Sequence, residues 1–232
     1  MTEAGCPLGG RPNAWKWKLE TMIVEHLAVG PLQCNCSILA CKKTGEAIVI
    51  DPGDEAPKII SLLEDKKLKV KYILHTHAHF DHLGATQAVY DKNHSEVCLH
   101  QDDMFLYKNV AMQCALFGFE VKPVPQITNF LKQGDSIRFG EYKMDVLHTP
   151  GHTPGSLSFH LKADTPLLFT GDTLFMQSIG RTDLWGGDYN LILKSIQEQL
   201  LQFDDDTIVH PGHGPSSSIG FERRENPFLQ DL

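Results

Sequence analysis

Short apolar runs, separated by polar segments rich in glycine and proline, recur along the whole 232-residue chain. Runs of this length, bounded by turn residues, predict buried β-strands, whereas an apolar residue every three or four positions predicts an amphipathic helix. Strands are predicted at residues 22–29, 37–40, 47–50, 70–74, 136–139, 143–147, 157–161, 167–169 and 207–209. Helices are predicted at residues 57–63, 81–93, 101–117 and 189–203.

The last predicted helix follows Asp188, a residue type that caps helix N-termini well. Its inward-facing residues are expected to be Leu191, Leu193, Ile196 and Leu200. Helices and strands alternate loosely in the first half of the chain and hairpins dominate the middle, which predicts mixed sheets with helices outside, an α/β layered sandwich. No linker divides the chain, so we expect one domain over residues 21–232, preceded by an N-terminal arm over residues 1–20.

The composition narrows the class of protein. A formal net charge of −8 and a pI near 5.8 argue against a nucleic-acid partner, because nucleic-acid binders normally carry a basic excess. No apolar stretch reaches 18 residues and the N-terminus has no signal-peptide core, so we expect no membrane partner and a cytoplasmic protein. The six cysteines are then expected to be free structural thiols, with Cys34 and Cys36 buried on one strand face. The oligomeric state stays open.

Four potential metal ligands lie within six residues: His77, His79, Asp81 and His82. Imidazole and carboxylate are ligands that zinc and similar ions prefer. The alternative is a run of exposed polar residues in a loop. The run follows a predicted buried strand and precedes a predicted helix, a position where α/β proteins place their sites, which favours a metal site.

Three further candidates follow apolar runs and lie next to glycine: His152, Asp172 and His213. His152 and His213 both follow a Pro-Gly pair. One such histidine would be weak support for a metal site. Three such loops, in a chain that already carries the histidine-rich segment, indicate that these side chains complete it.

The ordered set of these seven residues resembles the metallo-β-lactamase fold superfamily. Segments 149–156, 179–183 and 221–228 are similar to its glyoxalase-II-like thioesterases. The resemblance implies a four-layer αβ/βα sandwich of two mixed β-sheets flanked by helices, with two divalent metal ions, zinc or else iron or manganese. The implied ligands are His77, His79 and His152 for the first ion, Asp81, His82 and His213 for the second, and Asp172 as a bridge. Asp51 is similar to an aspartate that orients a ligand imidazole, although a turn residue before Pro52 and Gly53 is an alternative.

The same resemblance implies hydrolysis of a small-molecule thioester, for example a glutathione conjugate such as S-lactoylglutathione, with Asp81 and Asp172 at the reaction centre. Arg181, Arg223 and Arg224 are candidates for binding glutathione carboxylates. For Arg181 the alternative is an ion pair with Asp183, and for the other two a solvated helix. The sequence ends some twenty residues after His213, without the helical extension that grips glutathione in longer family members, so strict glutathione specificity is not implied.

Two rival functions remain from the sequence. Persulfide dioxygenases of the same superfamily use one iron, for which the counterparts here are His77, His152 and Asp172, but residues 174–190 resemble the hydrolase form more closely. The other rival is a non-catalytic metal-binding protein, but structural zinc sites are closed by four ligands and often use cysteine. A β-lactamase is expected to carry a secretion signal, and a nuclease a basic surface. The other histidines are expected to be structural or surface residues: His26, His75, His94, His100, His148, His160 and His210.

Overall fold

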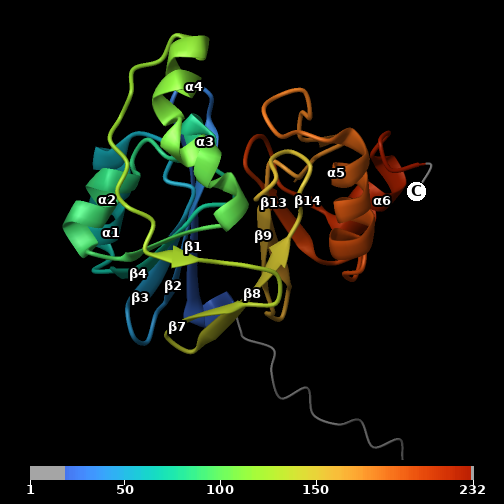
Figure 1. The fold of residues 1–232 in the computed structure, drawn as a ribbon. Coiled ribbons are helices and arrows are strands. Elements are labelled where there is room, and N and C mark those ends of the chain that lie inside the picture. Colours follow the sequence, from blue (N-terminus) through green and yellow to red (C-terminus); the bar gives the residue numbers. More distant parts are fainter. Residues whose placement is uncertain (1–18, 231–232) are drawn as a thin grey trace, which may run out of the picture.

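Two six-stranded mixed sheets face each other in the computed structural model, which describes residues 19–230, and helices cover both outer faces (Figure 1). The strands are β1 (Met22–Val29), β2 (Cys34–Cys41), β3 (Glu46–Ile50), β4 (Lys69–Leu74), β5 (Glu96–Leu99), β6 (Asn129–Phe130), β7 (Ser136–Phe139), β8 (Tyr142–His148), β9 (Leu157–Leu161), β10 (Leu167–Gly171), β11 (Leu174–Phe175), β12 (Ser178–Ile179), β13 (Ile208–Pro211) and β14 (Ser217–Ser218). The helices are α1 (Ala56–Asp65), α2 (Thr86–Asn93), α3 (Met104–Lys108), α4 (Val110–Phe117), α5 (Tyr189–Ser195) and α6 (Ile219–Glu225), with short helical turns η1 (Leu19–Thr21), η2 (Phe80–His82), η3 (Gln101–Asp103) and η4 (Ile196–Leu200).

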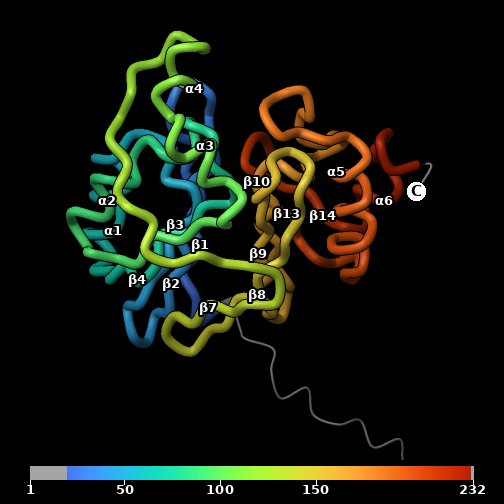
Figure 2. The backbone as a smooth tube through the Cα atoms, in the orientation of Figure 1, coloured from blue at the N-terminus to red at the C-terminus, as the bar shows by residue number. Residues whose placement is uncertain are grey.

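Each six-stranded sheet combines parallel and antiparallel pairs, and β11 and β12 form a separate antiparallel pair. The first sheet has the order β1-β2-β3-β4-β5-β6, with parallel pairing from β3 to β6. The second has the order β14-β13-β10-β9-β8-β7, in which only β10 and β13 run parallel. The backbone trace shows the two halves of the chain lying side by side as two similar lobes (Figure 2).

Three apolar layers hold the sandwich together. The central layer joins inward side chains of both sheets, including Leu39 and Ile48 from the first and Phe159 and Phe169 from the second. A second layer packs the first sheet against α1 and α2, and a third packs the second sheet against α5 and η4. Because apolar burial is the main favourable contribution to folding, the three layers fix the sheets relative to each other. The predicted four-layer αβ/βα sandwich is confirmed.

The predicted helix boundaries are wrong in two places. The segment predicted as a helix over 81–93 begins as the single turn η2, and α2 starts only at Thr86. The reason is the close approach of two backbones, since a Cβ at Gly84 would overlap the carbonyl of Gly53. The predicted helix 101–117 is divided into η3, α3 and α4, with Asn109 in a non-helical conformation between α3 and α4.

The predicted helix 189–203 consists of α5 followed by the π-helical turn η4. Asp188 caps it as predicted, and its Oδ1 accepts from the Leu191 amide at 2.9 Å. The inward position predicted for Leu191 is wrong, because its side chain is exposed and Ile192 is buried instead. Ile192, Ile196 and Leu200 follow one another at intervals of four residues and form the buried stripe.

The cysteine prediction holds for the described residues. Cys34 and Cys36 are both fully buried on β2, and Cys41, Cys98 and Cys114 are free thiols as well. Cys6 and most of the predicted arm over residues 1–20 lie outside the described residues. Within residues 19–230, no helix has the length and apolar character needed to cross a bilayer.

Candidate metal centre

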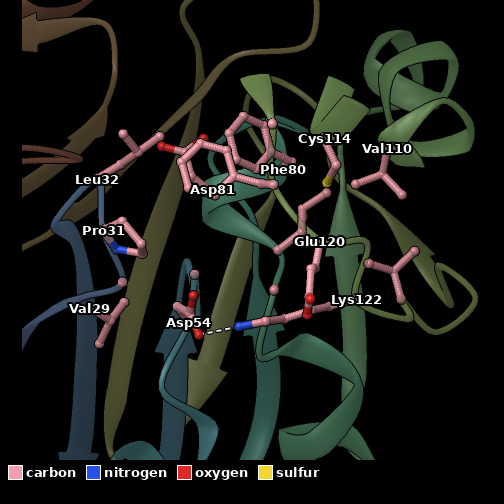
Figure 3. A pocket seen from close by; sticks show the side chains of 17 residues that line it. Val29, Pro31, Leu32, Asp54, Phe80, Asp81, Val110, Cys114, Glu120 and Lys122 are labelled. Carbon is pink, nitrogen blue, oxygen red and sulfur yellow. Dashed lines mark hydrogen bonds and ion pairs between the residues drawn. The ribbon is translucent and has the colours of Figure 1, made fainter. Parts of the chain in front are cut away.

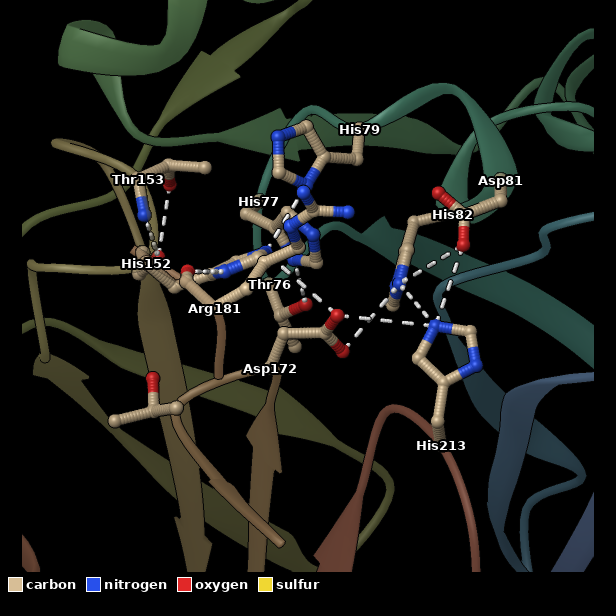
Figure 4. Close-up of polar contacts among 12 residues, drawn as sticks. Thr76, His77, His79, Asp81, His82, His152, Thr153, Asp172, Arg181 and His213 are labelled. Carbon is tan, nitrogen blue, oxygen red and sulfur yellow. Dashed lines mark hydrogen bonds and ion pairs between the residues drawn. The ribbon is translucent and has the colours of Figure 1, made fainter. Parts of the chain in front are cut away.

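Loops from both sheets meet at one end of the sandwich and bring the seven predicted ligands together (Figure 4). The loop after β4 and the turn η2 supply the histidine-rich segment, and loops after β8, β10 and β13 supply the rest. Three overlapping groups have all their potential ligand atoms within 4.8 Å of one another. These groups are His77 with His79 and His152, then His77 with His82 and Asp172, and then Asp81 with His82 and His213.

The first trio, which we define as His77, His79 and His152, consists of imidazoles only. All three side chains are buried. His79 Nδ1 lies 3.0 Å from His152 Nε2. Two nitrogens bound to one tetrahedral zinc ion, each at its usual bond length, are about 3.3 Å apart. The spacing of the first trio is therefore close to that of a metal site.

The second trio, which we define as Asp81, His82 and His213, includes a carboxylate. His213 Nε2 lies 3.2 Å from His82 Nε2 and 3.2 Å from Asp81 Oδ2. Burial alone would lower the pKa of His213, but the carboxylates of Asp81 and Asp172 raise it. The second trio therefore attracts positive charge.

Asp172 lies between the two trios. Its Oδ2 is 3.6 Å from His152 Nε2, and its Oδ1 is 3.5 Å from His82 Nε2. Four buried side-chain atoms within residues 19–230 have no hydrogen-bond partner, and two of them, Asp172 Oδ1 and His77 Nε2, belong to this centre. A buried acceptor without a partner is costly, and a cation between the side chains would satisfy both atoms. The donor set therefore fits two metal ions with Asp172 between them.

The outer nitrogens of the histidines indicate which ring atoms are free for a metal. His152 Nδ1 lies 2.7 Å from the Arg181 carbonyl, and His213 Nδ1 lies 2.9 Å from the Leu32 carbonyl. A carbonyl only accepts, so each Nδ1 carries a hydrogen and donates it. The Nε2 lone pairs then point into the centre, as is usual for metal-binding histidines.

Asp51 belongs to neither trio but contacts both, through Thr76 beside His77 and through His82. Its carboxylate accepts from the Thr76 amide at 2.8 Å and from Thr76 Oγ1 at 2.6 Å, and it lies 3.0 Å from His82 Nδ1. Thr76 Oγ1 is in turn 3.0 Å from His77 Nδ1. One buried carboxylate thus orients a ring in each trio, which is the position expected for a residue that orients ligand imidazoles.

Burial gives the first trio a different electrostatic character from the second. It lowers the pKa of His79 to about 3 and lowers that of His152. Both rings are therefore neutral at pH 7, the form in which imidazole binds metals. In the second trio, burial by itself would raise the pKa of Asp81, but the nearby rings of His82 and His213 hold it well below its usual range. That carboxylate is therefore ionised.

Asp103 is a buried residue that the sequence did not single out. Its carboxylate accepts from the amides of Ala78 at 2.9 Å and Gly155 at 2.6 Å, and from Thr153 Oγ1 at 2.9 Å. Burial raises the pKa of Asp103 to about 6. These bonds join the loop of His77 and His79 to the loop of His152. Asp103 follows β5, a strand the sequence did not predict, so no strand-end signal marked it.

Gln113 on α4 supports the same loop from the helix side. Its Nε2 donates to the Ala78 carbonyl at 3.0 Å, and its Oε1 accepts from the Phe80 amide at 3.2 Å.

The close packing around Asp172 explains the glycine of one Pro-Gly pair, since a Cβ at Gly212 would overlap Asp172 Oδ1. Glycine is therefore required there for contact, not for a positive φ.

A cavity of about 310 Å³, which we call the histidine cavity, opens over the centre. Its lining contains five of the candidate ligands, His79, Asp81, His152, Asp172 and His213. Its apolar side chains are Leu32, Phe80, Phe117, Phe119 and Leu184. A concave, largely apolar site with a few convergent polar groups is typical of small-molecule sites.

The three candidate arginines differ in position. Arg181 lines the histidine cavity, and its guanidinium makes two 2.8 Å hydrogen bonds with Asp183, so the predicted alternative for this residue is present. Arg223 lies on α6, pairs with Asp205 and donates to the Leu201 carbonyl at 2.8 Å. Arg224 is exposed on the same helix. Neither Arg223 nor Arg224 lines the histidine cavity, so the structure does not bring them to the site.

The other histidines lie mainly in stacked or buried positions. His26 stacks on His210 with ring centroids 4.2 Å apart, and His100 stacks on His148 at the same distance. His75 is fully buried beside the centre, and burial lowers its pKa to about 4. None of these five rings lines the histidine cavity.

Comparison with known proteins places this geometry in a family. The family model of the metallo-beta-lactamase superfamily matches residues 29–213. A hydroxyacylglutathione hydrolase, GloC, from Haemophilus influenzae is 38% identical over 217 residues, which cover 90% of this chain and 98% of that protein.

Two crystal structures are similar over the same region. The BLEG-1 B3 metallo-beta-lactamase is 40% identical with a TM-score of 0.84, covering 90% of this chain and all of that one. The protein TTHA1623 in a di-iron-bound form is 37% identical with a TM-score of 0.81, covering 89% of this chain and all of that one. The chain belongs to the metallo-β-lactamase superfamily.

Proposed function

We propose that the protein is a dinuclear-metal hydrolase that cleaves small-molecule thioesters. The observation that carries this proposal is the pair of trios on either side of Asp172, next to a cavity of ligand size. His77, His79 and His152 would hold one ion, Asp81, His82 and His213 the other, and Asp172 would contact both. Imidazole and carboxylate donors suit zinc, with iron or manganese as alternatives.

Two divalent ions bound by these residues would supply a water of lowered pKa and would stabilise developing negative charge. The chain supplies the rest. The imidazoles of the first trio stay neutral because they are buried, and Asp81 stays ionised beside His82 and His213, so it can orient a water at the open side. In the overall reaction the water oxygen bonds to the acyl carbon, the carbon–sulfur bond breaks, and sulfur leaves with the electron pair. One proton of the water ends on the thiol and the other is released to solvent.

A thioester is proposed because no side chain that lines the histidine cavity, in the described part of the chain, is left to act as a general acid. The titratable side chains that line the histidine cavity, within residues 19–230, are five candidate ligands and Arg181. An amine leaving group needs a proton in the transition state, whereas a thiolate, with a thiol pKa near ~8.5, leaves without one. The similarity to a hydroxyacylglutathione hydrolase points the same way. A glutathione thioester is therefore one substrate to test.

Hydrolysis of a β-lactam is a second candidate, because a B3 metallo-beta-lactamase is 40% identical over nearly the whole chain.

Persulfide oxidation on a single iron would use only His77, His152 and Asp172. It would leave Asp81, His82 and His213 without an ion, although their potential ligand atoms lie within 4.8 Å of one another. The presence of this second group supports two ions and hydrolysis. The free thiols on β2 are consistent with a reducing compartment such as the cytoplasm.

One set of assays separates the three activities. Purified protein reconstituted with zinc, iron or manganese is given S-lactoylglutathione, a chromogenic cephalosporin, or glutathione persulfide with an oxygen electrode. We expect thiol release from the thioester, abolished in His77→Ala and retained in the control His94→Asn, which changes an exposed histidine at the end of α2. Oxygen uptake or lactam opening without thiol release would overturn the proposal.

A further inference from the structure

A second cavity, of about 330 Å³, lies beside the histidine cavity, and we call it the side cavity (Figure 3). It opens between the turn that joins β1 to β2 and the helix α4. Four residues line both cavities: Leu32, Phe80, Asp81 and Phe119. The rings of Phe80 and Phe119 have centroids 5.1 Å apart. The side cavity therefore shares a wall with the candidate metal centre and has the volume of a small-molecule pocket.

Most of the surface near this shared wall is apolar. Val29, Pro31 and Leu32 form one side, and Val110 and Cys114 lie on the other, where the Cys114 sulfur points into the space (Figure 3). An apolar ligand gains free energy in such a space because its surface leaves water. A polar or charged ligand would lose hydration without finding partners along these two walls.

Apart from Asp81 at the shared wall, the charged groups of the side cavity lie at the end away from the histidine centre. Asp54 and Lys122 form an ion pair there, and Glu120 lies on the same side (Figure 3). The ammonium of Lys122 is already paired, and two carboxylates against one ammonium leave a net negative charge. This end would repel the carboxylates of a glutathione group. A neutral chain is the ligand that both the walls and the charges favour.

We infer that the side cavity holds the aliphatic acyl chain of a thioester substrate, an inference that rests on the proposed hydrolase function. The acyl carbon then lies at the shared wall, next to Asp81, and the chain extends between Leu32 and Val110. The thiol half lies on the open side of the histidine cavity, near Arg181. The enzyme prefers medium-length apolar acyl groups to short polar ones.

The test is a series of S-acyl-N-acetylcysteamine thioesters with acetyl, butanoyl, hexanoyl and octanoyl groups, hydrolysed by the metal-loaded full chain. The thiol is neutral and constant, so only the acyl chain varies. We expect kcat/KM to rise by up to about fourfold for each added methylene until the cavity is filled. A flat or falling profile would overturn the inference.

Two variants locate the effect. Cys114→Phe and Val110→Phe each place a ring in the side cavity, and each is expected to reduce the ratio of octanoyl to acetyl kcat/KM by more than tenfold. A ratio within one variant is independent of how much protein folds. Met112→Phe is the matched control, because Met112 lies on α4 with 52% of its surface exposed and lines neither cavity. An unchanged ratio in both cavity variants would reject the assignment.

Failure of this inference is distinguishable from failure of the proposed function. Hydrolysis of S-lactoylglutathione with a flat chain-length profile leaves the function in place and rejects the acyl site. If no thioester is hydrolysed, the proposed function is rejected. Calorimetric titration with 1-octanol then tests whether the side cavity binds an aliphatic chain. Octanol binding that Cys114→Phe abolishes and Met112→Phe retains supports an aliphatic-chain site, and absence of binding rejects it.

Discussion

The two trios of the candidate metal centre differ in charge and in exposure. The first trio is built from three buried imidazoles, and burial keeps His79 and His152 neutral. The second contains Asp81 and the partly exposed His213, whose side chain is 26% exposed and whose pKa the carboxylates raise. The first trio is thus preorganised by burial and hydrogen bonds, whereas in the second trio a cation must compete with protons.

The largest expected effect comes from removing Asp172, because this carboxylate faces both trios. We expect Asp172→Ala to lose both metal ions and to lower kcat/KM by more than about 100-fold, since even outer-shell partners of metal ligands cost 10- to 100-fold. Metal content and thioester turnover measure the two effects. Asp164→Ala, an exposed aspartate before the other end of β10, is the control. Two retained ions in Asp172→Ala would remove Asp172 from the centre.

Removing His213 should separate the trios. His213→Ala takes one of three donors from the second trio and none from the first, so we expect one metal ion per chain to remain bound with little change in affinity. Thioester turnover should fall strongly, because the second ion is lost. Metal titration followed by calorimetry measures the number of sites. If the variant still binds two ions with wild-type affinity, the division into two trios is wrong.

The sequence predicts the candidate ligands better than it predicts the residues whose hydrogen bonds hold the ligand loops in place. His152, Asp172 and His213 each follow an apolar strand beside a glycine, and this local pattern is visible without a structure. Asp103 and Gln113 act on backbone groups of a loop far away in the chain, so nothing beside them in sequence indicates their contacts.

The sequence does not predict these helix boundaries, for the same reason. Gly84 interrupts the predicted helix 81–93 because it packs against Gly53, a residue 31 positions earlier. The apolar pattern around residues 81–93 contains no sign of that contact. Local patterns predict elements and motif residues, whereas close backbone approaches depend on the assembled fold.

Asp103 and Asp51 test how each trio is held in place. Asp103→Asn replaces one acceptor oxygen by an NH₂ group, which faces N–H or O–H donors and cannot accept from them. The two loops that carry the first trio therefore lose a hydrogen bond between them. We expect about a tenfold loss of affinity at the first site and a smaller loss at the second. Asp51→Asn should weaken both sites, because Asp51 contacts Thr76 and His82. Equal losses at both sites in Asp103→Asn would contradict its assignment to the first trio.

Proton release on metal binding should come mainly from the second trio. Because Asp81 and Asp172 raise the pKa of His213, the ring holds a proton below that pKa, and an incoming cation must displace it. The number of protons released therefore grows, and affinity falls, as the pH is lowered. Calorimetry of zinc binding in buffers of different ionisation enthalpy measures this number. A proton count that is the same in His213→Ala would contradict the contrast between the trios.

The smallest effect is expected at Arg181, at the edge of the histidine cavity. Its guanidinium is exposed and already bound to Asp183. We expect Arg181→Ala to raise the KM for S-lactoylglutathione by less than about fivefold, the scale of an exposed ion pair. The melting temperature should hardly change. A much larger rise in KM, with kcat unchanged, would show that Arg181 leaves Asp183 and binds the substrate.

The most direct test of the central claim is a crystal structure of the zinc-loaded protein with anomalous scattering recorded at the zinc edge. We predict two peaks, one within bonding distance of His77, His79 and His152, and one within bonding distance of Asp81, His82 and His213. Asp172 should lie between them. A single peak at the first trio, or peaks only at the His100–His148 stack, would contradict a dinuclear centre.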